Sequence, residues 1–204
     1  MQNPEAFYDT ITIVRELAPS LGGVSRLEVQ RAAYLSCLLA LFKGRPLADW
    51  GYRFARTDFG TPFSAGINDA VEFLLGSGSL SNEDGKFALT SRSLQLELIL
   101  KRLHNLAERD IFLHAACGSA LAVPASTFSE GLDNEPTVQS AFHRSSGGGL
   151  LEGPALHLLY EHFDGLTKVL DARNSDLLTP SVVWLSYIAN QPVSERQDGG
   201  GRGD

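Results

Sequence analysis

The sequence has only two cysteines, and they stand far apart. Cys37 and Cys117 each lack a second cysteine two or three positions away. Zinc sites and disulfide frameworks need clustered or paired cysteines, so neither is expected here. We expect two reduced, buried thiols, which are typical of a cytoplasmic protein.

Long hydrophobic runs are missing as well. The longest, over residues 35–42, is much shorter than the roughly 20 residues of a membrane-spanning helix. The first ten residues, MQNPEAFYDT, have neither the basic nor the apolar region of a secretory signal. We therefore expect no membrane segment and no export, which again favours the cytoplasm.

Positive charge is scarce, above all in the second half. The chain carries 17 Lys/Arg and 24 Asp/Glu, a net charge of -7. Residues 1–110 hold 12 cations and 13 anions, a net of -1, whereas residues 111–204 hold 5 and 11, a net of -6. Nucleic-acid affinity depends on clustered cations. Only Arg45, Arg53 and Arg56 offer a local basic patch, so we expect nucleic-acid contacts to be weak or indirect.

Catalytic motifs are equally sparse. There is no Gly-x-Ser-x-Gly elbow, and the glycine run at 147–149 lacks the Gly-Lys-Ser/Thr ending of a phosphate-binding loop. His157 and Glu161 share a helix face and could bind a metal, but this spacing is common by chance. The sequence predicts no catalytic residue, no metal and no cofactor, and therefore a protein that is not an enzyme.

Helical periodicity dominates what is present. It predicts helices over about 4–18, 25–43, 64–76, 90–106, 108–121 and 155–170, and from 179 onward. Ser25 and Glu28 form a capping box for the second helix, and Asp84-Gly85 predicts a β-hairpin turn. The predicted fold is mainly α. It has an N-terminal domain over 1–106, a helical region over 107–192 with a long loop at 124–154, and a disordered tail over 193–204.

Six large apolar or rigid side chains are gathered within 14 positions: Trp50, Tyr52, Phe54, Phe59, Pro62 and Phe63. The alternation from Trp50 to Phe54 predicts a short, half-buried extended segment. Trp50 and Phe54 are expected to pack into the core.

A second interpretation applies to the rest of this aromatic segment. Phe59, Pro62 and Phe63 would stay partly exposed as a protein-docking patch, because aromatic anchors dominate the energetics of interfaces. Arg53 and Arg56 would border that patch. These five residues are the predicted partner-binding residues.

The order of these features resembles a known family. Ala33-Tyr34-Leu35 is followed by Trp50-x-Tyr52-x-Phe54, the turn from Phe59 to Ser64, a helix, and a hairpin ending in Phe87-Ala-Leu-Thr90. Residues 25–106 resemble the winged-helix core of SocA-like (Panacea) antitoxin domains. They also resemble the middle components of three-component bacterial ABC-ATPase conflict systems, which include the accessory subunit of Lamassu-type antiphage defence. The turn at Gly60-Thr61-Pro62 is one residue longer than the usual Gly-Pro turn.

The sequence predicts a winged-helix-like unit over residues 50–90, and the resemblance implies a non-enzymatic accessory subunit. Such a subunit bridges an SMC/Rad50-like ATPase and an effector. A toxin-neutralising antitoxin, a winged-helix DNA regulator and an unrecognised enzyme are the alternatives. The predicted helix over 67–75 would face DNA in a regulator, yet it offers Asn68, Asp69 and Glu72 and no Lys or Arg.

Overall fold

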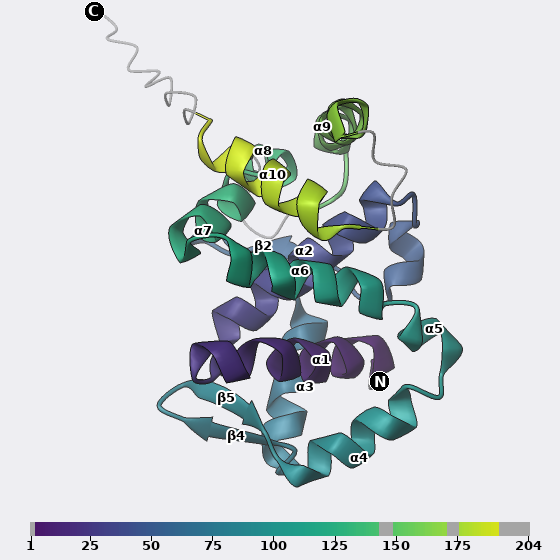
Figure 1. Ribbon diagram of the computed structural model, residues 1–204, viewed down its shortest axis with the longest axis vertical. Helices are drawn as coiled ribbons and strands as arrows, with labels where there is room; N and C mark the ends of the chain where they lie inside the picture. The colour runs from purple at the N-terminus through teal and green to yellow at the C-terminus, as the bar shows by residue number, and fades with distance from the viewer. Residues whose placement is uncertain (1–2, 143–148, 171–175, 192–204) are drawn as a thin grey trace, which may run out of the picture.

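The computed structural model describes residues 3–142, 149–170 and 176–191. These residues form a mainly helical fold with two small antiparallel sheets, so the predicted fold class is confirmed at this level (Figure 1). The helices are α1 (Pro4–Leu21), α2 (Arg26–Phe42), the 3-10 helix η1 (Leu47–Trp50), α3 (Ala65–Gly76), α4 (Ser91–Leu100), α5 (His104–Ala107), α6 (Asp110–Ala122), α7 (Ala125–Asp133), α8 (Pro136–Phe142), α9 (Ala155–Leu170) and α10 (Leu178–Ala189). The strands are β1 (Val24–Ser25), β2 (Ala55–Arg56), β3 (Pro62–Phe63), β4 (Leu80–Glu83) and β5 (Lys86–Leu89).

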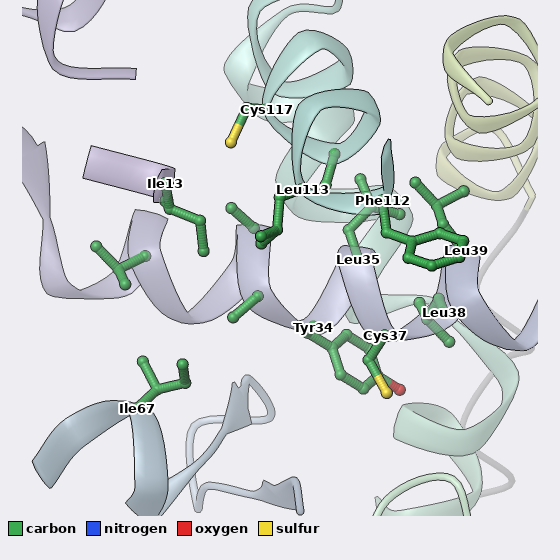
Figure 2. Packing of buried hydrophobic residues seen from close by; sticks show 14 of the residues in the cluster. Ile13, Tyr34, Leu35, Cys37, Leu38, Leu39, Ile67, Phe112, Leu113 and Cys117 are labelled. Atoms are coloured by element: carbon green, nitrogen blue, oxygen red, sulfur yellow. The ribbon is translucent and has the colours of Figure 1, made fainter. Parts of the chain in front are cut away.

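Helix α2 is the centre of the core. Almost every residue from 29 to 41 is buried, because α1, α3 and α6 pack around it. Figure 2 shows Leu35 of α2 close to Leu113 of α6, and Ile13 of α1 beside the same cluster. Cys37 and Cys117 are free, buried thiols within this core, as predicted.

The predicted capping box begins α2. The Ser25 hydroxyl accepts a hydrogen bond from the Glu28 N–H at 3.3 Å, and the Glu28 carboxylate accepts one from the Ser25 N–H at 2.6 Å. Both bonds satisfy backbone donors that have no partner inside the helix.

The predicted hairpin is strands β4 and β5, paired with Glu83 opposite Lys86. Its two-residue turn needs positive φ at both positions. Asp84 has a φ of 50° and Gly85 a φ of 80°. Strand β1, which the sequence did not predict, adds to the other edge of β5 and gives the order β1-β5-β4.

Two predictions of extended or irregular chain were wrong. Trp50, the first residue of the predicted extended segment, is the last residue of a 3-10 helix, and strand pairing begins only at Ala55. The long loop expected over 124–154 contains helices α7 and α8 between residues 125 and 142. The segment is rich in Ser and Thr, which suggested a loop, but Phe128 and Leu132 stand at helical spacing and form a short buried apolar face.

A buried carboxylate explains where α8 begins. Glu135 accepts hydrogen bonds from the N–H groups of Thr137 and Val138 at 2.9 and 3.0 Å. The Tyr34 hydroxyl of α2 also donates to Glu135, at 2.7 Å. Burial raises the pKa of Glu135, and these donors counteract that effect. The same group thus starts a helix and ties it to α2.

The two predicted regions share one hydrophobic cluster. Helix α6, which belongs to the predicted C-terminal region, packs on α1 and α2, and α10 packs on α6 and α7. The division at residue 106 stays a prediction, and the predicted tail over 193–204 lies outside the described residues. None of the described helices is long and apolar enough to cross a membrane.

Candidate functional site

The aromatic segment over 50–63 divides into a buried and an exposed part. Trp50, Tyr52 and Phe54 are at most 8% exposed, and neighbouring rings in this series meet edge to face with centroids 6.2 and 5.5 Å apart. The prediction that Trp50 and Phe54 belong to the core is confirmed.

The predicted docking patch does not form as one surface. Phe59 is 94% exposed on the turn between β2 and β3, whereas Pro62 is buried and Phe63 is partly buried. Strand β3 pairs with β2, placing Pro62 opposite Arg56, and it packs against α2, which turns Pro62 inward. The expectation of an exposed Pro62 was therefore wrong.

The two arginines predicted to border the patch differ from each other. The Arg53 side chain is 91% exposed and lies 3.9 Å from the Glu152 carboxylate. Arg56 is only partly exposed. Phe59 and Arg53 thus remain exposed, whereas Pro62 is buried and Arg56 and Phe63 are partly buried.

A buried polar cluster lies beneath this segment. Arg109 Nε donates to Asp9 Oδ1 at 2.7 Å, a second guanidinium nitrogen and the Tyr52 hydroxyl donate to Asp9 Oδ2, and Arg109 Nη1 donates to the Trp50 carbonyl at 3.0 Å. The guanidinium carbon also lies 3.6 Å from the centre of the Trp50 ring, a cation–π arrangement. Burial raises the pKa of Asp9, and the charge of Arg109 opposes that shift.

The contacts of this cluster are structural and hold neighbouring elements together. It joins α1, the aromatic segment and α6, and every charged oxygen of Asp9 already has a donor. The adjoining cavity of about 110 Å³ is smaller than the roughly 300 Å³ at which small-molecule sites begin. Throughout the described part of the chain, no group of three or more His, Cys, Asp or Glu side chains could hold a metal.

The first extended apolar surface is on α4. We call it the α4 surface; its residues are Leu94, Leu98, Ile99 and the adjacent Leu103. They are 54%, 66%, 63% and 46% exposed. By contrast, the polar residues Ser93 and Glu97 of the same helix are buried. Helix α4 packs Leu96 and Leu100 against the protein but still presents three large apolar side chains to solvent, which is unusual for a surface helix.

Specific polar contacts hold α4 in this orientation. Glu97, whose side chain is 7% exposed, forms ion pairs with Arg15 of α1 and with Lys101, the latter at 2.9 Å. Arg92 Nη1 donates to the Ser77 carbonyl at 2.7 Å. Rotating α4 to bury Leu98 would break these contacts.

The second apolar surface lies between α9 and α10. We call it the α9–α10 groove; it has a volume of about 340 Å³ and is lined by Glu161, His162, Gly165, Leu166, Val169, Val183, Trp184 and Tyr187. Val169 is 79% exposed and Tyr187 57% exposed. The Trp184 indole N–H is buried and makes no hydrogen bond to the residues that the structure describes. Burial lowers the pKa of His162 and so favours its neutral form.

The two surfaces lie at opposite ends of the long axis of the molecule. Figure 1 shows α4 at the bottom and α9 and α10 at the top. Their local charges are opposite in sign. Residues 91–103 contain the cations Arg92, Lys101 and Arg102 and only the buried anion Glu97. The described residues of 155–191 contain three anions, Glu161, Asp164 and Asp176, and one cation, Lys168.

Neither surface was predicted from the sequence, although a signal for the first exists. Leu94, Leu96, Leu98 and Leu100 occupy every second position of a helix, so at 100° per residue they cannot all face the core. The comparisons with known proteins add no further assignment. No family model matches the chain, and no curated protein or solved structure matches it.

Proposed function

We propose that the protein is a non-enzymatic adaptor that bridges two unlike proteins through its two ends. One observation carries this proposal: two exposed apolar surfaces stand at opposite ends of the molecule and have opposite local charge. Large exposed apolar patches rimmed by polar residues are characteristic of protein interaction sites.

The charges favour two different partners. Charge complementarity sets the orientation and the rate of association, and like charges across an interface are strongly unfavourable. The cationic α4 surface suits a partner with acidic residues around its apolar anchor. The α9–α10 groove, with the carboxylate of Glu161 in its lining, suits a partner with basic residues there.

In its biological form, we propose an accessory subunit of a cytoplasmic antiphage defence complex, which bridges an SMC-like ATPase and an effector. The resemblance of residues 25–106 to middle components supports this role. The order of α2, α3 and the β4–β5 hairpin, with β1 as a third strand, agrees with a winged-helix unit.

The features of α3 argue against a DNA regulator. Asp69 and Glu72 are exposed on this helix, and Glu72 pairs with Arg26 at 2.5 Å. A helix that carries these two carboxylates and no Lys or Arg of its own is poorly suited to contact the phosphate backbone. We therefore propose protein docking rather than direct DNA contact.

Co-purification with the products of adjacent genes tests the proposal. We expect the tagged full-length protein to retain an SMC-like ATPase together with a second, effector protein. If the neighbouring genes encode no such ATPase, the defence role is wrong. If only one partner is retained and its binding suppresses toxicity, the protein is an antitoxin instead.

A further inference from the structure

The α4 surface combines an apolar stripe with cations at both of its edges. We propose that it binds one amphipathic helix of a partner protein, whose apolar residues are flanked by Glu or Asp. This inference rests on the proposed function, because it assigns the chemistry of one of the two docking ends.

Helical spacing gives the position of the charges. Residues seven apart complete almost two turns and share a helix face. Lys101 follows Leu94 by seven positions, and Ile99 follows Arg92 by seven. Arg92 therefore stands near the line of Ile99, and Lys101, the C-cap residue that also pairs with Glu97, stands near the line of Leu94; Arg102 follows just past the end of α4. A carboxylate on either flank of a docked helix would meet a cation.

The exposure of the stripe is a fixed property of the fold. Burying Leu98 against α1 would turn Glu97 toward solvent and break its ion pair with Arg15, which also pairs with Glu16. The largely buried Glu97 would lose its contact with Arg15, and breaking a buried ion pair is costly. The stripe thus stays outward before any partner arrives, and binding needs no rearrangement of α4.

The shape of the surface favours a helix as the occupant. Helix α4 has ten residues and is about 15 Å long, which matches the contact of one short helix packed along another. A symmetric dimer through two α4 surfaces would bring the cations Arg92, Lys101 and Arg102 of the two copies close to one another. Like charges at an interface oppose such pairing.

A selection experiment on the full-length protein tests the inference. The probe is a displayed library of helical peptides with a constant leucine stripe, in which each flanking position encodes Glu, Lys or Gln. On the wild type we expect Glu to be enriched over Lys by about fivefold or more, the effect of one to two exposed ion pairs. The double variant Arg92→Glu/Arg102→Glu should reverse the preference toward Lys, which a folding defect cannot do.

Two single variants complete the design. Leu98→Glu should abolish the selection, because it places a charge in the apolar stripe. Leu27→Glu is the matched control, because Leu27 is also a leucine on a helix, 43% exposed at the start of α2. This variant should enrich the same peptides as the wild type. Circular dichroism confirms that each variant is folded.

Several results would overturn the inference. The inference is wrong if the wild type enriches neither Glu nor Lys at the flanking positions, or if it enriches Lys. It is also wrong if the Leu98→Glu variant selects the same peptides as the wild type. Self-association that Leu98→Glu removes would identify a second copy as the occupant. Binding to anionic vesicles that Leu98→Glu removes would identify a lipid surface. The adaptor role fails separately, if co-purification yields no partner while the library behaves as expected.

Discussion

Arg109 is surrounded by groups that depend on its charge. Its guanidinium neutralises the fully buried Asp9 carboxylate and covers the face of Trp50. We predict that Arg109→Met lowers the free energy of unfolding by about 3–5 kcal/mol, because it leaves a buried carboxylate without its counter-charge. Urea denaturation measures this change.

The double variant Asp9→Asn/Arg109→Met is the control for that prediction. It removes both charges, so its loss of stability should be smaller than the sum of the two single losses. Additive losses would show that the pair is not coupled. The pair itself was not predictable, because its members are 100 positions apart in the sequence.

Two phenylalanines in the aromatic segment differ in how far they are exposed to solvent. Phe54 is 3% exposed and Phe59 is 94% exposed. We predict that Phe54→Ala costs about 3–5 kcal/mol of stability, whereas Phe59→Ser changes it by no more than about 0.5 kcal/mol. Thermal unfolding of both variants checks this prediction. A large loss for Phe59→Ser would mean that this ring packs against the protein in solution.

The burial of Trp50 and Phe54 followed from the period-two alternation of the segment. The burial of Pro62 did not follow from the alternation, because it depends on the pairing of β3 with β2 and on the contact of β3 with α2. Local patterns indicate which side chains alternate. They do not indicate which side of a short strand meets a helix from elsewhere in the chain.

At the scale of elements, the start of α2 should depend on pH. Burial opposes the charge of Glu28, but its hydrogen bonds with Ser25 and its ion pair with Lys86 outweigh that effect and lower its pKa below the ordinary 4.5. A lowered carboxyl pKa in the folded state stabilises the protein at pH values above the unfolded-state pKa. This stabilisation is lost as the pH falls through the folded-state pKa.

We therefore predict a pH-dependent effect of Glu28→Gln. The stability difference between wild type and variant should be constant above about pH 5 and should shrink below about pH 4. Denaturant unfolding at several pH values measures it. If this stability difference does not change with pH, the negative charge of Glu28 does not stabilise the fold.

Elements with a strong local signal were predictable, and those defined by tertiary contacts were not. The capping box of α2 and the Asp84-Gly85 hairpin were both confirmed. Helices α7 and α8 were not predicted, because they are short and rich in Ser and Thr. Helix α8 also depends on a tertiary contact, since the buried Glu135 that caps it contacts Tyr34 of α2. The outward apolar face of α4 depends on an ion pair between Glu97 and Arg15 of another helix.

At the scale of the whole molecule, the adaptor role requires two ends that act independently. Leu98 and Tyr187 are 66% and 57% exposed at the two ends, so changing either residue should alter binding without altering the fold. No local pattern could have predicted this arrangement, because the distance between the ends arises from the packing of all the helices between them.

Native mass spectrometry of the complex formed with the adjacent gene products tests this central claim most directly. The wild type and the Leu27→Glu control should give a complex of three different proteins. Leu98→Glu should lose one partner and retain the other, and Tyr187→Glu should do the opposite. If both variants lose the same partner, or if neither loses any, the protein does not bridge two partners through its two ends.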